Sequence, residues 1–203
     1  MVQTPLKPET ETLVINLPTT INLYVTVEQF TALAATNRDL RLERNAKGEL
    51  IVNPPTGWET GKQNLSISGE LYLWWRNLGD GQAFDSSTGF ILSNGAIYSP
   101  DASWISQQRW ETLTSEEKTT FPKICPDFVV ELKSKSDRLS LLQTKMKEYI
   151  NHGTKLGWLI NPQQRQVEIY RSNLEVEILD NPTQLSGEQI LSSFVLNLNR
   201  VWG

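Results

Sequence analysis

A carboxylate and a lysine lie two residues apart at the end of an apolar segment. Glu131 follows the run Phe128–Val130, and Lys133 is two residues further on. On a strand, residues i and i+2 project to the same face, with Cα atoms roughly 6.5–7 Å apart. Such a carboxylate can hold a hard cation while the lysine faces a nucleophile or a phosphate. The alternative is a salt-bridged strand end with an exposed lysine, because Glu-x-Lys is a common sequence.

A second carboxylate could complete the site. Asp101 follows Pro100 on a predicted strand, and if this strand pairs with residues 128–133, Asp101 and Glu131 can share one metal ion. Asp127 also follows a proline, but it lies four residues from Glu131 on the same strand, roughly 13 Å away. Hard cations take oxygen ligands at about 2.0–2.6 Å. Asp101 is therefore the candidate ligand, and Asp127 is expected to open the strand.

Other familiar chemistries lack their residues. The chain has one histidine, His152, which excludes a His-rich zinc site and weakens any Ser-His-Asp triad. It contains no Gly-x-x-x-x-Gly-Lys phosphate loop and no Gly-x-Gly-x-x-Gly motif. Its single cysteine, Cys125, cannot form an internal disulfide, which favours a reducing, cytoplasmic setting.

Composition and patterning favour one globular domain. The 203 residues are 38% hydrophobic with a net charge of −4, which excludes wholesale disorder and a histone-like basic protein. No apolar run reaches about 18 residues, so no transmembrane helix is expected, and the N-terminus lacks the apolar region of a secretory signal. Residues 1–20 are expected to form a flexible extension, and residues 21–203 a single domain.

The order of predicted elements indicates an α/β fold with a mixed sheet. Amphipathic periodicity predicts helices over 59–78 and 139–151, and a capping box at Thr26 predicts a short helix after it. Alternating or continuous apolar runs predict the remaining elements as strands. These comprise a hairpin over 40–52, a second hairpin over 89–98 whose second strand continues through 102–105, and strands at 128–132, 156–160, 167–169 and 176–178.

These motifs resemble a known nuclease signature. Pro100-Asp101 followed by Glu131-Leu132-Lys133 is similar to the PD-(D/E)xK signature. The chain also resembles the Uma2 family, common in cyanobacteria, over about residues 50–200, in the stretches 55–61, 84–90, 99–102, 125–134 and 157–162. The resemblance implies a restriction-endonuclease-like core, a mixed β-sheet flanked by helices. It also implies an endonuclease that hydrolyses phosphodiester bonds with Mg²⁺ or Mn²⁺, nucleic acid as substrate with DNA favoured, and a possible homodimer.

The resemblance also implies further site residues. The backbone carbonyl of Leu132 would join Asp101 and Glu131 as a metal ligand. Glu59, at the start of the 59–78 helix, could supply a third carboxylate, directly or through water. The alternative for Glu59 is an acid that interacts with the helix dipole. Lys145 is a reserve candidate for the catalytic lysine, because a helix lysine replaces the strand lysine in some related nucleases.

Two other functions stay open. A nucleic-acid-binding or regulatory module that lost turnover is favoured by the net charge of −4, because phosphate contacts normally need Lys and Arg. Against this, a local basic stretch follows the candidate site, formed by Lys133, Lys135, Arg138, Lys145 and Lys147. A hydrolase that uses the same carboxylates on a different substrate is the third possibility.

Overall fold

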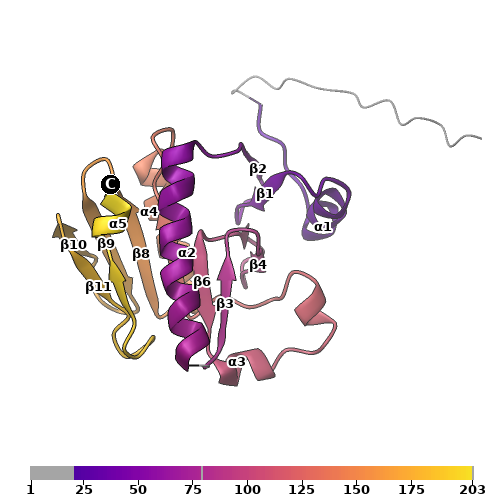
Figure 1. The fold of residues 1–203 in the computed structure, drawn as a ribbon. Helices are drawn as coiled ribbons and strands as arrows, with labels where there is room; N and C mark the ends of the chain where they lie inside the picture. The colour runs from indigo at the N-terminus through magenta and orange to yellow at the C-terminus, as the bar shows by residue number, and fades with distance from the viewer. Residues whose placement is uncertain (1–20, 79, 203) are drawn as a thin grey trace, which may run out of the picture.

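A six-stranded mixed sheet forms the centre of the molecule (Figure 1). The computed structural model describes residues 21–78 and 80–202, and the predicted extension 1–20 lies outside this range. The β7 and β8 strands run parallel, and all other neighbours in this sheet run antiparallel. In spatial order the strands are β10 (Glu177–Asp180), β9 (Gln166–Arg171), β8 (Leu156–Asn161), β7 (Phe128–Leu132), β6 (Ala102–Ile105) and β3 (Gln82–Asp85).

Helices cover both faces of this sheet, so its central strands are apolar on both sides. The α2 helix (Trp58–Leu78) buries Ile67 and Leu71 against the face that carries Val130. The α4 helix (Leu139–Asn151) connects β7 to the parallel strand β8 and buries Met146 against the opposite face. Both helices have the bounds expected from the sequence to within one residue, because their apolar stripes match the two sheet faces.

The C-terminal elements pack on the same side of the sheet as α2. Strands β11 (Gln184–Ser186) and β12 (Val195–Asn197) form a two-stranded ribbon, and α5 (Asn199–Trp202) follows it. Leu185, Leu196 and Val201 from these elements are buried in the cluster that contains Ile67 of α2. The ribbon and α5 therefore extend the layer formed by α2.

A second, four-stranded sheet combines both predicted hairpins. Its order is β2 (Leu50–Asn53), β1 (Arg41–Arg44), β5 (Ile97–Tyr98) and β4 (Phe90–Ile91). The α1 helix (Val27–Thr36) begins with the predicted capping box at Thr26 and packs Phe30 against this sheet. The prediction that 102–105 continues the second strand of the hairpin is wrong, because β5 and β6 belong to different sheets. Pro100 lies between them, and proline lacks the amide N–H that a continuous ladder needs.

The segment between β6 and β7 leads to the start of β7. It contains α3 (Gln107–Glu111) and a short 3₁₀ helix at Glu117–Thr119. Asp127 opens β7 as predicted, with a fully buried carboxylate that accepts hydrogen bonds from the amide and hydroxyl of Ser106 at 2.9 and 3.0 Å. Lys155 and Arg109 form ion pairs with Asp127 at 2.8 and 3.2 Å. None of the helices in the described part of the chain is long and apolar enough to cross a membrane.

Candidate active site

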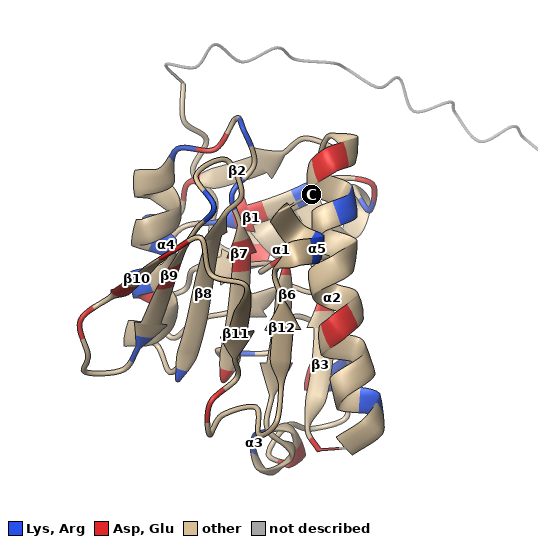
Figure 2. Ribbon diagram, turned by 60° about the vertical axis from the view of Figure 1, so that its left-hand side comes forward, with Lys and Arg blue, Asp and Glu red and all other residues tan. Residues whose placement is uncertain are grey.

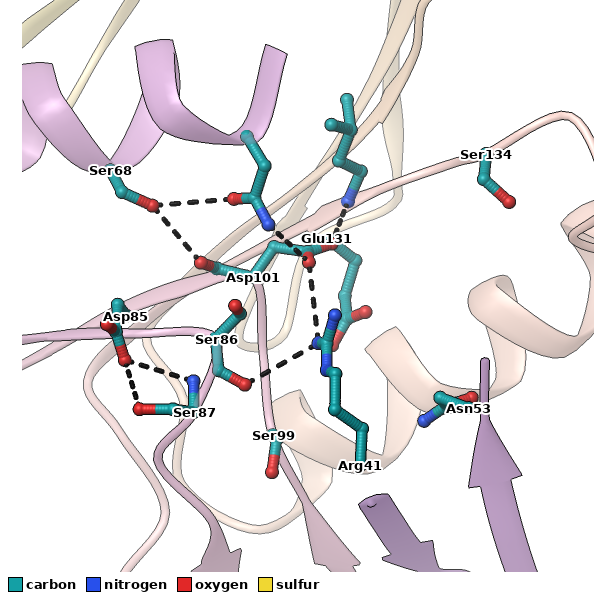
Figure 3. A network of polar contacts seen from close by, with 12 residues as sticks. Arg41, Asn53, Ser68, Asp85, Ser86, Ser87, Ser99, Asp101, Glu131 and Ser134 are labelled. Atoms are coloured by element: carbon teal, nitrogen blue, oxygen red, sulfur yellow. Dashed lines mark hydrogen bonds and ion pairs between the residues drawn. The ribbon is translucent and has the colours of Figure 1, made fainter. Parts of the chain in front are cut away.

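The strands that carry Asp101 and Glu131 pair as predicted. Antiparallel pairing of β6 with β7 places Ala102 opposite Val130, so Asp101 and Glu131 are the next pair along the ladder. The amide of Leu132 donates a 2.8 Å hydrogen bond to Oδ2 of Asp101. The Asp101 side chain thus binds the backbone of β7 at the point where the β6–β7 ladder ends (Figure 3).

Asp101 is held by side chains from two other elements. Asn64 of α2 donates a 3.0 Å hydrogen bond to Oδ1 of Asp101, and Ser68, one turn further along α2, donates to the Asp101 carbonyl at 3.3 Å. The guanidinium of Arg41, from β1, lies 3.9 Å from the same Oδ1 (Figure 3). Burial raises the pKa of Asp101, although the Leu132 amide and nearby positive charges act against this shift.

Glu131 is buried against α4. Its Oε1 atom lies 2.7 Å from Nζ of Lys145 and accepts a 3.0 Å hydrogen bond from the hydroxyl of Tyr149. These α4 residues are four apart, so they project from the same face of the helix toward β7. Burial raises the pKa of Glu131, Lys145 acts against this shift, and the charges of Asp101 and Glu43 add to it.

Lys145 connects Glu131 to another buried carboxylate, Glu43 of β1. Its Nζ atom lies 2.8 Å from Oε1 of Glu43. That carboxylate also accepts hydrogen bonds from the amide of Ser99 at 2.8 Å and from Asn53 at 3.2 Å. Burial alone would lower the pKa of Lys145, but the two carboxylates outweigh this and raise it, so the ammonium stays charged. Figure 2 shows acidic residues of β1 and β7 meeting at one end of the central sheet.

The side chain of Lys133 does not contact Asp101 or Glu131. Its Nζ atom donates to the carbonyl of Ser134 at 3.0 Å and to Oε1 of Gln163 at 3.3 Å. Because β7 ends at Leu132, the alternation that would align Lys133 with Glu131 stops there. Within residues 21–78 and 80–202, the lysine that contacts Glu131 is Lys145.

Of the other two predicted site residues, Leu132 adjoins the site through its backbone, whereas Glu59 lies away from it at the surface. The side chain of Leu132 is buried in the core on the α2 side, so only its backbone can serve the site. The side chain of Glu59 is 61% exposed and pairs with Lys62 at 3.1 Å on the surface of α2. The structure thus leaves Glu59 at the surface, and α2 contributes Asn64 to the site instead.

The donors at this site suit a hard divalent cation. Mg²⁺ is commonly bound through one or two carboxylates together with waters and substrate phosphates. Asp101, Glu131 and the Leu132 carbonyl would supply oxygen donors of that kind, and a cation would favour the charged forms of two carboxylates whose pKa values burial raises. In the described part of the chain, no three residues among His, Cys, Asp and Glu are grouped to hold a metal ion. An ion held by this set would therefore need water or phosphate as its further ligands.

Four residues of this site were not expected from the sequence: Arg41, Glu43, Asn64 and Tyr149. The sequence did contain one sign of a buried ion pair: Lys145 interrupts the apolar stripe of its helix between Leu142 and Tyr149. A lysine in such a stripe needs a buried acidic partner. Nothing local distinguishes Glu43, because its partner lies 102 residues further along the chain.

A mixed sheet with helices on both faces is a fold that is also found in a solved structure. The chain resembles the crystal structure of "a putative nuclease belonging to DUF820" from Anabaena variabilis ATCC 29413, with a TM-score of 0.72 and 20% sequence identity. The match covers 88% of this chain and 97% of the other, and at this identity it shows the fold alone. The sequence model of the Uma2 family, described as "Putative restriction endonuclease", matches residues 27–199, so the chain belongs to the Uma2 family. No curated protein matches the chain.

Proposed function

We propose that this protein is a Mg²⁺- or Mn²⁺-dependent endonuclease that hydrolyses phosphodiester bonds of nucleic acid, with DNA as the favoured substrate. The observation that carries the proposal is the pair of carboxylates formed by the buried Glu131 and the partly buried Asp101, with the Lys145 ammonium 2.7 Å from Glu131. Membership of a family described as "Putative restriction endonuclease" supports this class of reaction.

Asp101, Glu131 and the Leu132 carbonyl would hold the ion. When bound, it would polarise the scissile phosphate and lower the pKa of a water molecule, so that hydroxide forms near neutral pH. Asn64 and the Leu132 amide fix the orientation of the Asp101 carboxylate, and Tyr149 fixes that of Glu131. Carboxylates held in place in this way need little rearrangement when the substrate arrives.

We assign the catalytic lysine to α4. Lys145 is buried between Glu43 and Glu131, and both carboxylates raise its pKa. A lysine in this state does not act as a base at neutral pH. Its role would be to stabilise negative charge that develops on the phosphate.

Lys133 would then act in substrate binding. It begins the connection between β7 and α4, which also carries Lys135 and Arg138. This connection begins two residues after Glu131, so its positive charges would lie on the approach to the carboxylates. Such side chains can neutralise phosphates on either side of the cleaved bond. This local charge would offset the net charge of −4 of the whole chain.

We also propose a cytoplasmic location. Cys125 is buried beside Thr154, 3.2 Å from its hydroxyl, and burial raises the pKa of the thiol to about 11. It is the only cysteine of the chain, and a reducing compartment suits a thiol without a disulfide partner.

The test is a cleavage assay combined with a binding measurement. The full chain is incubated with plasmid, single-stranded DNA or RNA in Mg²⁺, Mn²⁺ or EDTA, and metal affinity is measured by calorimetry. We expect cleavage that needs the metal, and loss of both cleavage and metal binding in Glu131→Gln. The matched control is Glu168→Gln on β9. Glu168 is also buried, but it accepts hydrogen bonds from Gln143 of α4 and Tyr170 of β9 and lies outside the candidate site.

Two results would contradict the proposal in different ways. Metal binding without cleavage of any substrate would make the nucleic-acid-binding or regulatory module the preferred function. Cleavage that survives in Glu131→Gln would place the active site elsewhere in the molecule.

A further inference from the structure

Arg41 lies beside the candidate metal ligand Asp101 but is only loosely bound there (Figure 3). Its Nη2 atom is 3.9 Å from Oδ1 of Asp101, which is beyond hydrogen-bonding distance. Among the described residues, its side chain makes one hydrogen bond, to the carbonyl of Ser86 at 3.5 Å. Its Nε atom is buried and has no hydrogen-bond partner in that part of the chain. A guanidinium has five N–H donors, so the described protein groups leave most donors of Arg41 unused.

Another arginine of the same strand shows what a structural role requires. Arg44 donates hydrogen bonds to the carbonyl of Val25, at 2.7 Å, and to that of Gly95. These bonds connect β1 to the segment before α1 and to the turn between β4 and β5. Arg41 makes no comparable bond in the described part of the chain, and its side chain is 39% exposed. The packing and hydrogen bonding of β1 therefore give no reason for an arginine at position 41.

Asp101 already has its hydrogen bonds without Arg41. Its Oδ1 atom accepts from Asn64 at 3.0 Å, and its Oδ2 atom accepts from the Leu132 amide at 2.8 Å. The contribution of Arg41 is charge, because burial raises the pKa of Asp101 and Arg41 is one of the groups that act to lower it. In the metal-free protein Arg41 is thus a counter-ion of Asp101, and other groups orient the carboxylate.

A metal ion on Asp101 would take over this charge compensation. Hard cations lie about 2.0–2.6 Å from their oxygen ligands, so an ion bound to Asp101 would be close to the guanidinium of Arg41. Arginine is always charged in proteins, and two cations at short range repel each other. Arg41 must therefore either turn away from Asp101 or weaken the binding of the ion.

A phosphate of the substrate is a suitable new partner for this guanidinium. The planar fork of arginine matches two phosphate oxygens. Glu43, two residues further along β1, pairs with Lys145 of the candidate site, so the strand directs Arg41 to the same side. Because its side chain makes only one long hydrogen bond, Arg41 can reorient at little cost.

We propose that Arg41 neutralises Asp101 in the free protein and transfers to a phosphate of the nucleic acid when the metal ion binds. This inference rests on the proposed function and adds to it a regulation of the metal site. Arg41 disfavours the ion while no substrate is present, and its transfer to a phosphate removes that effect. Metal and nucleic acid should therefore bind cooperatively, and each should raise the affinity for the other by the same factor.

The first test measures metal affinity in the absence of nucleic acid. In calorimetric titrations of the full chain, Arg41→Met should bind Mn²⁺ about fivefold or more tightly than the wild type, the lower end of usual couplings between two sites. A residue that orients Asp101 has the opposite effect when it is removed. The matched control is Arg38→Met, which removes the same charge from an exposed turn before β1 and should leave the affinity unchanged. An unchanged or lower affinity in Arg41→Met would overturn the proposal.

The second test repeats the titration with nucleic acid bound. A phosphorothioate oligodeoxynucleotide, which resists hydrolysis, should raise the Mn²⁺ affinity of the wild type. This gain should be smaller in Arg41→Met by about fivefold or more. Arg41→Lys keeps the charge but loses the planar fork, so without the oligonucleotide it should bind Mn²⁺ as weakly as the wild type, and its gain should also decrease. An equal gain in all three proteins would show that no phosphate takes over Arg41 and would overturn the proposal.

The same measurements separate this inference from the proposed function. If the wild type binds no Mn²⁺ with or without the oligonucleotide, or if Glu131→Gln retains the binding, the proposed function fails and this inference fails with it. If Glu131→Gln loses the binding but Arg41→Met has the affinity of the wild type, this inference alone is wrong. Melting temperatures in EDTA show whether Arg41→Met is folded. If it is not, the gain measured with Arg41→Lys decides, because that variant keeps the counter-ion of Asp101.

Discussion

The Nζ atom of Lys145 lies between two buried carboxylates, 2.7 Å from Glu131 and 2.8 Å from Glu43. Glu131 belongs to the central sheet and Glu43 to the smaller one, so this ammonium is the common ion-pair partner of both sheets.

Substitution can distinguish the role of Lys145 from that of Lys133. Lys145→Met should lower the cleavage rate by about 10²–10³, because it removes a positioned charge from the reacting phosphate. Lys133→Met should weaken substrate binding and change the rate at saturating substrate much less. Rates at saturating and limiting substrate distinguish these effects. The reverse outcome would return the catalytic role to Lys133, as the strand spacing alone predicts.

The Lys145→Met variant should also be less stable. It leaves Glu43 and Glu131 buried without their cation, and breaking such a pair typically costs about 3–5 kcal/mol. Urea unfolding near neutral pH measures this decrease in the free energy of unfolding. Lys147→Met on the same helix is the control, because Lys147 is exposed and should change stability by at most about 0.5 kcal/mol.

Metal-free stability should fall as the pH rises. Burial raises the pKa of Asp101 and of Glu131 above their ordinary values of 3.8 and 4.5, so the folded state binds more protons than the unfolded state above those values. The free energy of unfolding in EDTA should therefore decrease as the pH rises above about 4–5. Because Mg²⁺ competes with protons for the same oxygens, its stabilising effect should increase with pH.

Thermal melts at a series of pH values, with Mg²⁺ or EDTA, test this coupling. Asp101→Asn should raise the metal-free melting temperature at neutral pH and abolish the response to Mg²⁺. An undiminished response in that variant would place the ion at another site.

Asn64 should affect metal affinity through Asp101. Asn64→Ala removes the hydrogen bond to Oδ1, which should lower metal affinity by about 10–100-fold, the usual effect of removing a group that orients a ligand. Asn77→Ala is the control, because Asn77 lies exposed near the end of the same helix. Calorimetric titration with Mn²⁺ measures the metal affinity of both variants. Equal affinities for the two variants would show that Asp101 needs no orientation by α2.

Asp127 should matter for folding and not for the metal. Burial would raise the pKa of Asp127, but hydrogen bonds from Lys155 and Ser106 and the charge of Arg109 lower it overall. The stability it contributes is present above its ordinary pKa of 3.8 and is lost as the pH falls through the lower, folded value. Asp127→Asn should cost about 3 kcal/mol at pH 7 and less in strong acid, with an unchanged Mg²⁺ response. A changed metal response would mean that Asp127 communicates with the site along β7.

Much of the fold follows from local patterns. The helices at 58–78 and 139–151 have apolar stripes that match one sheet face each, and β7 is apolar on both faces because helices cover both. The boundary between β5 and β6 was missed because the apolar runs on either side of Ser99-Pro100-Asp101 both have strand character, so the pattern does not show that the chain changes sheet at Pro100.

The candidate site was harder to predict than the fold. The pairing of Asp101 with Glu131 followed from a sequence motif and from strand geometry. Lys133 fits the same motif, yet the strand ends one residue before it and its side chain turns to Gln163. Glu43 could not be found from spacing, because its ion pair with Lys145 depends on how the two sheets pack.

The packing of the two sheets against each other makes the site sensitive to partial unfolding. The hairpin formed by β1 and β2 shares only the ladder pair Arg44–Ile97 with the rest of its sheet, and side-chain contacts of Glu43 and Arg41 supply its other links to the site. Short, weakly connected elements open more often than the core, on the timescale that hydrogen exchange detects. Each opening of this hairpin would release Glu43 and leave Lys145 with Glu131 alone, while β7 and its carboxylate stay in the protected core. The lifetime of the complete site would then be set by the hairpin, whose amide exchange rate would limit how long the active arrangement persists.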